Sequence, residues 1–503
     1  MATDVPHQTE TNDPPAALPR AATGIPGLDV VLGGGVLRRQ LYVIEGMAGT
    51  GKTTLALHFL LAGRATGERC LWITTAETPD ELRTAAHAYG WSLEGVEVLA
   101  LPMVDRMAHP DQRQTLFQPA HVELDETMQE ILTALARVQP ARVVLDSLSI
   151  LRDMTDDPLA YRRQVLVLKQ ALGVLGCTAL VTDELAEAPD PHVRTQAHGV
   201  VRLLREVTAF GNQQRQVEIV KMRGMAFHSG RHDLVLATGG LQVFPRLGPP
   251  ADDVGVPSAV ESTGVARLDS LLGGGLDRGT STLLVGAAGT GKSSLAAHVV
   301  VAAAERGEPS AMFLFDESVR ALITRSRGIG FDLERHMESG LVRVKSLDPA
   351  EVSPGEFIQG IRDAVEKDGA RVLVIDSLNG YLNAMPEEHF VMIQLHELLA
   401  YLGQLGVVTL LINAQAGLIG HMSSTVDVSY LADTVILLRY YETRGEVRQA
   451  ISVLKKRTGS HERTIRELRI SSDGLHIGDP LRSFRGVLTG VPQEETGPEP
   501  ASR

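Results

Sequence analysis

A long internal repeat constrains the fold of this chain more than any other feature. Lys52 and Lys292 lie near the ends of two glycine-rich motifs and are 240 positions apart. Three segments recur at this spacing: residues 23–29 return at 263–269, 32–35 at 272–275 and 46–53 at 286–293. Repeats that stack into solenoids have periods of roughly 20 to 50 residues. The chain is therefore predicted to contain two tandem domains of one fold.

The repeat also sets the expected domain boundaries. The first domain is predicted over residues 21–246 and the second over residues 262–485. The segment 247–261 is rich in proline, glycine and aspartate and is predicted to be a linker. Residues 1–20 are predicted to be a disordered N-terminal tail and residues 486–503 a C-terminal tail; disorder is expected in residues 1–20 and 491–503, because both are polar and contain proline. The spacing between copies falls to 230 at Asp146 and Asp376, so the first copy has extra residues, expected in a loop at 105–121.

Apolar runs alternate with amphipathic stretches in both copies. Leu41–Ile44 and Val372–Ile375 are continuous apolar segments, whereas Thr127–Val138 and Phe357–Lys367 have helical spacing. Continuous apolar strands joined by helices are typical of a parallel sheet that is covered on both faces. The predicted fold class is α/β, with each domain a mainly parallel sheet flanked by helices.

Each copy contains Gly-x-x-x-x-Gly-Lys-Thr/Ser between a predicted strand and a predicted helix. In this pattern the backbone N–H groups curl around nucleotide phosphates, the lysine reaches the terminal phosphates and the next hydroxyl binds Mg²⁺. Two copies at one spacing argue against a chance match. The predicted nucleotide-binding residues are Gly46, Gly49, Thr50, Gly51, Lys52, Thr53 and Thr54, and Gly286, Gly289, Thr290, Gly291, Lys292, Ser293 and Ser294.

A phosphate loop also needs an acidic group that holds the metal, in some cases through water. Asp146 and Asp376 each end an apolar strand at equivalent places in the two copies. Each aspartate could instead cap the next helix. Their repetition favours Mg²⁺ binding, together with Thr53 and Ser293.

Hydrolysis further requires a group that orients or deprotonates the attacking oxygen. Glu77 and Glu317 follow the second predicted strand of each copy, and Asp316 precedes Glu317 where the first copy has Ala76. These carboxylates could merely favour a helix N-terminus. We predict that Glu77, Glu317 and Asp316 are catalytic and that the two sites differ chemically.

At this point the pattern resembles a known family. Tandem phosphate loops, each preceded by Thr-Gly-x-x-x-Leu-Asp and Leu-Gly-Gly-Gly, are similar to those of the KaiC-like proteins of the RecA superfamily, from about Gly24 to Gly490. The resemblance implies two RecA-like domains that bind ATP and Mg²⁺ and hydrolyse ATP. It also implies a homohexamer of two stacked rings, with ATP at the subunit interfaces.

The family has a Lys-x-Arg-Gly segment that acts on the nucleotide of a neighbouring subunit. It is matched by Lys221 and Arg223 in the first domain and by Lys455 and Arg457 in the second, where Thr458 replaces the glycine. A solvated basic turn is the alternative interpretation. The resemblance implies that these four residues are catalytic, because cations stabilise charge on the phosphoryl group during transfer.

The family's phosphorylation segment has a Ser-Thr pair before an Asp-Thr strand. Ser429 matches the serine, Tyr430 replaces the threonine, and Asp433 and Thr434 follow. Ser429 is therefore the predicted phosphorylation site, with an ordinary loop hydroxyl as the alternative. The tyrosine argues against an ordered cycle of two phosphorylations.

The composition limits the classes of partner and compartment. The net charge of −13 argues against a surface devoted to nucleic acid, which requires clustered Lys and Arg. Cys70 and Cys177 cannot form a disulfide framework, and no apolar run approaches the roughly 20 residues that span a membrane. We expect a cytoplasmic protein that binds neither nucleic acid nor membrane.

Three functions fit these features to different degrees. The favoured one is an ATPase and serine/threonine autokinase in signal transduction, with itself and an unidentified signalling protein as partners. The alternative is a nucleotide-gated scaffold without kinase activity, because Ala76 and Thr458 depart from the repeated pattern. A DNA-dependent RecA-like motor is less favoured, since residues 414–427 contain no Lys or Arg.

Overall fold

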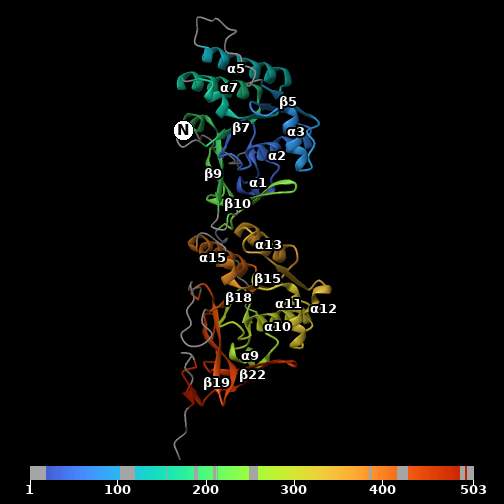
Figure 1. Cartoon of the computed structure of the whole chain (residues 1–503), viewed down its shortest axis with the longest axis vertical. Coiled ribbons are helices and arrows are strands. Elements are labelled where there is room, and N and C mark those ends of the chain that lie inside the picture. The colour runs from blue at the N-terminus through green and yellow to red at the C-terminus, as the bar shows by residue number, and fades with distance from the viewer. Residues whose placement is uncertain are drawn as a thin grey trace, which may run out of the picture. The chain divides into compact units, whose positions relative to one another are not determined.

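The computed structural model describes residues 18–101, 119–155, 157–185, 191–207, 211, 213–248, 259–383, 388–415, 429–487 and 493–494. The chain divides into two compact units (Figure 1): Met1–Glu206 with Gln213–Pro245, and Arg246–Arg503 with the short segment Val207–Asn212. Most of the two predicted tails, of the expected loop at 105–121 and of the predicted linker lies outside the described residues. Leu247 is the first residue of the predicted linker, and in the structure its side chain is buried in a hydrophobic cluster of the second unit.

The first unit alternates strands and helices before it ends in four consecutive strands. Its elements are β1 (Arg20–Ala21), α1 (Pro26–Val31), β2 (Val36–Leu37), β3 (Leu41–Gly46), α2 (Lys52–Ala65), β4 (Cys70–Thr74), α3 (Pro79–Ala88), β5 (Val96–Ala100), α5 (Pro119–Val138), β6 (Arg142–Asp146), α6 (Leu148–Asp153), α7 (Pro158–Leu175), β7 (Thr178–Glu184), α8 (Pro191–Gln196), β8 (Gly199–Val207), β9 (Gln213–Met222), β10 (Arg231–Ala237) and β11 (Gly240–Phe244).

The second unit follows a similar order, with α12 added before β16 and with β23 and β24 added after β22. Its elements are β12 (Val260–Glu261), α9 (Ala266–Leu271), β13 (Leu276–Asp277), β14 (Ser281–Gly286), α10 (Lys292–Glu305), β15 (Ser310–Leu314), α11 (Val319–Gly328), α12 (Leu333–Glu338), β16 (Val342–Ser346), α13 (Pro354–Glu366), β17 (Val372–Asp376), α14 (Leu378–Asn383), α15 (Glu388–Gln404), β18 (Val408–Ala414), β19 (Thr434–Thr443), β20 (Glu446–Lys456), β21 (Arg466–Ser471), β22 (Gly474–Pro480), β23 (Phe484–Arg485) and β24 (Gln493–Glu494).

Each unit is built on one large sheet. Within the described residues the first sheet has the order β11-β10-β9-β8-β3-β7-β6-β4-β5 and the second the order β16-β15-β17-β18-β14-β19-β20-β21-β22. The strand before each phosphate loop lies inside its sheet, because β3 pairs in parallel with β7 and β8, and β14 with β18 and β19. The predicted α/β class with two mainly parallel sheets is confirmed. Beyond the parallel part, β19 to β22 and β9 to β11 pair in antiparallel fashion.

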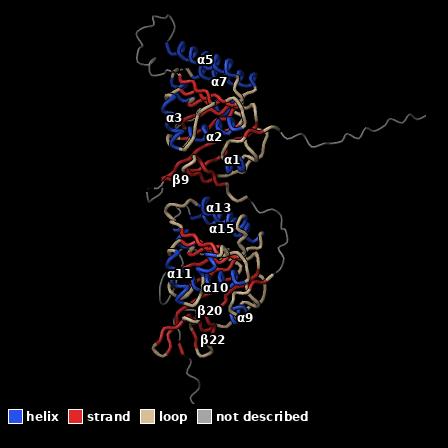
Figure 2. The backbone as a smooth tube through the Cα atoms, turned by 90° about the vertical axis from the view of Figure 1, so that its right-hand side faces the viewer, coloured by secondary structure: helices blue, strands red, loops and turns tan. Residues whose placement is uncertain are grey.

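Helices cover both faces of each sheet, as Figure 2 shows for the blue helices beside the red strands. Tyr42 and Ile44 of β3 join a core with α2, whereas Leu41 and Val43 join a core with α5 and α7. Alternate residues of a strand point to opposite faces, so a strand buried on both sides is apolar throughout. The second unit repeats this division, with α10 on one face and α13 and α15 on the other.

Candidate functional site

Both phosphate loops have the backbone shape that their glycines permit. Gly49 and Gly51 have φ angles of 75° and 103°, and Gly289 and Gly291 have φ angles of 80° and 99°. Side chains with a Cβ rarely adopt this left-handed region. Each loop leads directly from a central strand into a helix, α2 at Lys52 and α10 at Lys292. The first N–H groups of each helix lack intrahelical partners, so each loop ends at an anion-binding helix N-terminus.

Hydroxyl groups and the lysines hold each loop closed. Thr50 Oγ1 donates to the Met47 carbonyl at 2.8 Å, and Thr290 Oγ1 donates to the Ala287 carbonyl at 2.9 Å. Lys52 Nζ donates to the Gly46 and Met47 carbonyls at 2.7 and 3.0 Å.

The second lysine is held in the same way. Lys292 Nζ donates to the Gly286 and Ala287 carbonyls at 2.9 and 2.7 Å. Burial lowers the pKa of Lys52, and it lowers that of Lys292 to about 8. An anionic ligand at either loop would offset this desolvation, since an opposite charge favours the protonated amine.

The predicted metal ligands meet in the first unit. Thr53 Oγ1 donates to Asp146 Oδ2 at 2.9 Å, and the Thr182 hydroxyl donates to Asp146 Oδ1. Asp146 ends β6, next to β4 and β7 in the sheet, so its carboxylate lies at the edge where the phosphate loop begins. Thr182 was not predicted from the sequence, because a threonine in an apolar strand gives no signal of its own.

The second unit has the same pair in a more buried setting. Asp376 is 5% exposed, and its Oδ2 has no hydrogen-bond partner among the described residues. Burial raises the pKa of Asp376 to about 6, and a hydrogen bond from Ser293 opposes this rise. A buried carboxylate oxygen without a partner fits a cation.

The described residues contain no group of three or more His, Cys, Asp or Glu side chains placed to hold a metal.

Glu77 lies in the turn between β4 and α3, one residue before the helix cap. The backbone N–H of Glu77 donates to Thr74 Oγ1 at 2.9 Å, which fixes the turn. Thr78 caps α3, and the carboxylate that completes this capping box belongs to Glu81. Burial raises the pKa of Glu77, and the negative charges of Asp146 and Glu81 raise it further. The helix cap therefore does not require the Glu77 carboxylate.

In the second unit, the neighbouring carboxylates of Asp316 and Glu317 have different hydrogen-bond partners. Glu317 is held by the guanidinium of Arg325 from α11, with Nη1 to Oε2 at 2.5 Å and Nη2 to Oε1 at 2.7 Å. Asp316 accepts a hydrogen bond from the Ser377 hydroxyl, directly after Asp376. Arg325 was not predicted, and the equivalent position in the first copy is Ala85. The expected chemical difference between the two sites thus extends beyond Asp316.

The four basic residues of the Lys-x-Arg segments contact the backbone that precedes β8 and β19, whereas the phosphate loops follow the ends of the parallel neighbouring strands β3 and β14. Lys221 Nζ donates to the Arg194 and Ala197 carbonyls at 2.7 and 2.9 Å, and Arg223 Nη2 donates to the Thr195 carbonyl at 2.9 Å. Arg457 also pairs with the Asp433 carboxylate, with Nη1 and Oδ1 3.4 Å apart. These contacts leave the prediction that they act on a neighbouring subunit untested.

The second pair holds the segment that contains the predicted phosphorylation site. Lys455 Nζ donates to the Ser429 and Ala432 carbonyls at 3.0 and 2.7 Å, and Arg457 Nη2 donates to the Tyr430 carbonyl at 2.7 Å. Ser429 is half-buried and Tyr430 is exposed. The residues between 416 and 428 lie outside the described part of the chain.

The sheet registers identify the counterpart of Ser429 in the first unit. Gly199 pairs with Tyr42, and Thr434 pairs with the equivalent Thr282, so Ser429 corresponds to Arg194. Arg194 Nε donates to the buried carboxylate of Glu45 at 2.7 Å. The first unit therefore has a charged anchor where the second has a hydroxyl.

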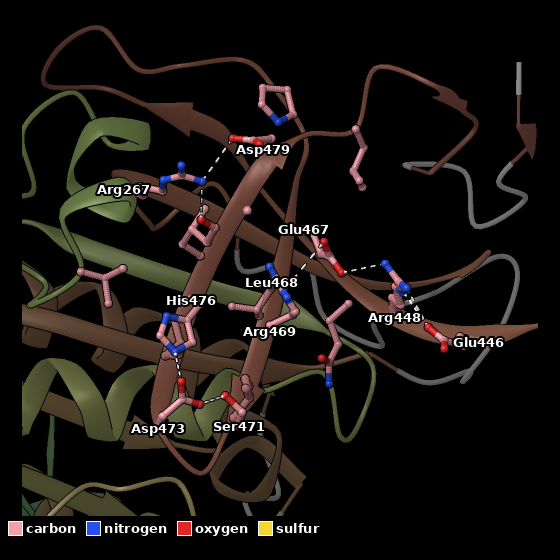
Figure 3. A pocket seen from close by; sticks show the side chains of 18 of the residues that line it. Arg267, Glu446, Arg448, Glu467, Leu468, Arg469, Ser471, Asp473, His476 and Asp479 are labelled. Carbon is pink, nitrogen blue, oxygen red and sulfur yellow. Dashed lines mark hydrogen bonds and ion pairs between the residues drawn. The ribbon is translucent and has the colours of Figure 1, made fainter. Parts of the chain in front are cut away.

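A separate hollow of about 1230 Å³ lies on β20, β21 and β22. Its charged side chains pair with one another, as Figure 3 shows for Arg448 between Glu446 and Glu467, and for His476 beside Asp473. None of the predicted site residues is among the described residues that line it.

Comparisons with known proteins agree with the resemblance seen in the motifs. The family described as "ATPase: KaiC" matches residues 21–248 and 261–482. The circadian clock oscillator protein KaiC of Parasynechococcus marenigrum is 29% identical over 95% of this chain and 94% of its own length. The circadian clock protein KaiC3 of Synechocystis sp. is 29% identical over 93% of this chain and 94% of its length. KaiC of Synechococcus elongatus is 28% identical over 95% of this chain and 93% of its own length.

No helix in the described parts of the chain is both long enough and apolar enough to cross a membrane.

Proposed function

The chain belongs to the KaiC family of ATPases, and from this premise we propose that both domains bind and hydrolyse ATP and that the second domain phosphorylates Ser429. The observation that carries the proposal is the repeated meeting of a phosphate-loop lysine, a helix hydroxyl and a strand-end aspartate. In the first unit this is Lys52 with Thr53 bonded to Asp146. Two copies of one arrangement are expected if each domain has its own nucleotide.

The proposed Mg²⁺ would be held by Thr53 and Asp146 in the first domain and by Ser293 and Asp376 in the second. When bound, Mg²⁺ supplies positive charge that neutralises the phosphate oxygens. Lys52 and Lys292 would turn from their loop carbonyls to the terminal phosphates of ATP. This exchange is favourable because the phosphates offer a buried ammonium a full negative charge.

Glu77 is the proposed general base of the first domain. Its carboxylate is not used by the helix cap, and its raised pKa makes it a better proton acceptor at neutral pH. It would orient a water molecule and accept one of its protons as the water oxygen attacks the terminal phosphorus. Asp316 and Glu317 are the candidates for the same task in the second domain.

The autokinase part of the proposal depends on the segment around Ser429. Two cationic side chains, Lys455 and Arg457, hold the backbone of this segment through its carbonyl groups. A fixed backbone limits the positions that the Ser429 hydroxyl can reach, which favours transfer to one acceptor. At the equivalent place the first domain has Arg194, which cannot accept a phosphoryl group in the same way.

Self-association is part of the proposed mechanism. We place Lys221, Arg223, Lys455 and Arg457 at the nucleotide of a neighbouring subunit in a homohexamer, because their positions match the family segment that acts in this way. The proposed setting is the cytoplasm, with an unidentified signalling protein as partner. The relatives named above are circadian clock proteins, but Tyr430 replaces the second phosphate acceptor expected from the resemblance.

A nucleotide-gated scaffold is the second candidate function. The observation that favours it is the ion pair between Glu317 and Arg325, which engages both oxygens of one proposed base. In that case the protein would bind ATP and assemble, but its second domain would not transfer a phosphoryl group.

Intact-mass spectrometry after incubation with Mg-ATP distinguishes the two. The autokinase predicts one added phosphate that peptide sequencing places on Ser429 and that both Ser429→Ala and Lys292→Ala abolish. Lys367→Ala, which changes an exposed lysine of α13, is the matched control and should retain the phosphate. ADP production without protein-bound phosphate would favour the scaffold or a plain ATPase and would remove Ser429 from the mechanism.

A further inference from the structure

The two proposed general bases differ in one contact. Both oxygens of Glu317 accept charge-assisted hydrogen bonds from Arg325, and the two side chains are 19% and 32% exposed. A bidentate guanidinium–carboxylate pair is among the strongest polar contacts in proteins and fixes the orientation of both groups. Glu77 has no ion-pair partner among the described residues, and Ala85 takes the place of Arg325.

The local sequence explains why the pair forms only in the second unit. Glu317 precedes the cap residue Ser318, and Arg325 lies two turns into α11, between Leu322 and Ser326, which face the core. This helix face directs the arginine back toward the strand-to-helix turn. In α3 the same face has Leu82 and Ala86 in the core and Ala85 between them, so this face of α3 has no cation to pair with Glu77.

We propose that Arg325 is a positioning residue that restrains the Glu317 carboxylate, so that the second domain hydrolyses ATP more slowly than the first. This inference rests on the proposed function, in which both domains hydrolyse ATP. The restraint would leave ATP bound in the second domain for longer than in the first.

The chemistry of hydrolysis explains the restraint. The water oxygen forms a bond to the terminal phosphorus, and the bond from that phosphorus to the bridging oxygen breaks, with its electron pair leaving on ADP. One water proton passes to the general base. A carboxylate in a guanidinium fork must give up part of that ion pair to accept the proton, because a neutral acid no longer attracts the cation. A carboxylate without such a partner does not have this cost.

The test measures ADP production by the full-length chain in a Glu77→Gln background, which retains the first phosphate loop but removes its proposed base. Adding Arg325→Ala should raise kcat about three- to tenfold with little change in KM, because the Glu317 carboxylate then accepts the proton without giving up an ion pair. Arg325→Lys should lie between, because an ammonium retains the charge but not the fork. Arg327→Ala is the matched control, since Arg327 lies on the same helix and pairs with Glu334 at the surface.

Two further variants separate positioning from a structural effect. Adding Glu317→Gln to Arg325→Ala should cancel the gain, because the freed carboxylate is then absent. In the opposite direction, Ala85→Arg in a chain with Asp316→Asn and Glu317→Gln should lower the kcat of the first domain about three- to tenfold by giving Glu77 the same partner.

The outcomes are distinct. An unchanged or lower kcat for Arg325→Ala, in protein that retains the circular dichroism and melting temperature of its background, overturns the role of Arg325. The same conclusion follows if the gain survives Glu317→Gln. If the unmodified chain produces no ADP at all, the proposed function itself has failed.

Discussion

Lys455 Nζ donates a hydrogen bond to the backbone carbonyl of Ser429 at 3.0 Å, across 26 positions of sequence. The same ammonium also bonds to the Ala432 carbonyl at 2.7 Å. The first unit repeats this contact, with Lys221 bonded to the carbonyl of Arg194, the counterpart of Ser429. A lysine expected to act on a neighbouring nucleotide thus also holds the backbone of the proposed phosphate acceptor.

This contact predicts the effect of Lys455→Ala. Removing the ammonium eliminates two charge-assisted hydrogen bonds, each worth roughly 1.5 to 3 kcal/mol, and frees the segment before β19. We expect phosphate on Ser429 to fall about tenfold or more, since transfer depends steeply on the position of the acceptor. Peptide mass spectrometry after incubation with Mg-ATP measures it, and Lys367→Ala serves as control. Unchanged phosphorylation would show that the Ser429 segment needs no anchor.

The hydroxyl of Thr182 is predicted to strengthen Mg²⁺ binding in the first domain alone. This hydroxyl orients the Asp146 carboxylate, and Thr182→Val removes it while retaining the shape of the side chain. Loss of such an outer contact typically weakens metal binding by about 10- to 100-fold. In a Lys292→Ala background, the Mg²⁺ concentration for half-maximal ADP production should rise by about tenfold. Thr133→Val on α5, where the hydroxyl bonds only to the Gln129 carbonyl, should leave it unchanged.

A buried ion pair predicts a large effect on the stability of the first domain. Arg142 is 2% exposed and donates to Glu68 Oε2 at 2.5 Å and to the Ala22 and Phe59 carbonyls at 2.6 and 2.8 Å. Glu68→Gln leaves this guanidinium without a counter-ion, and we expect a loss of about 2 to 3 kcal/mol in the free energy of unfolding.

Tryptophan fluorescence during denaturation measures this loss selectively, because both tryptophans, Trp72 and Trp91, are in the first unit. Asp80→Asn is the control, since Asp80 pairs with Arg83 at the surface and should cost less than about 1 kcal/mol. A similar loss in both variants would contradict the importance of burial.

The environment of His58 predicts that the stability of the first domain depends on pH. Its Nε2 accepts the Leu241 N–H at 2.9 Å, its ring packs on Trp91 with centroids 4.5 Å apart, and burial lowers its pKa from 6.5 to about 4. The unfolded chain therefore takes up a proton first as the pH falls. The stability contributed by neutral His58 is complete above pH 6.5 and is lost progressively between pH 6.5 and 4.

The comparison of wild type with His58→Gln isolates this effect, because glutamine offers an acceptor oxygen but does not titrate. The advantage of wild type in unfolding free energy should shrink by about 2 kcal/mol between pH 7.5 and pH 5. Denaturation followed by tryptophan fluorescence at both pH values measures it. A constant difference would mean that folding does not lower the pKa of His58.

The sequence was sufficient for the architecture of the parallel part of each sheet. Strands such as Leu41–Ile44 and Val372–Ile375 are buried on both faces. Such strands must be apolar at every position, and a continuous apolar run can be recognised in the sequence alone. The antiparallel strands from β9 to β11 were not anticipated individually. Most side chains of β9 are exposed or half-buried, so its sequence has no continuous apolar run. Its place in the sheet follows from its antiparallel pairing with β10.

The candidate sites divide in the same way. The phosphate loops could be located from sequence because backbone shape and chemistry lie within eight consecutive residues, Gly46 to Thr53. The contacts of Thr182 with Asp146, of Arg194 with Glu45 and of Arg325 with Glu317 had no local signature.

By itself, then, the sequence determined that two α/β domains each carry a phosphate loop, because glycine spacing and apolar periodicity are local properties of the chain. Only the tertiary structure decided which charges meet at those loops. Hydrogen bonds and ion pairs form over about 3 Å, and the folding of strand, turn and helix sets which distant side chains come that close. For this reason Glu77 and Glu317, alike in sequence, differ in their surroundings: a cation reaches the second carboxylate, and none among the described residues reaches the first.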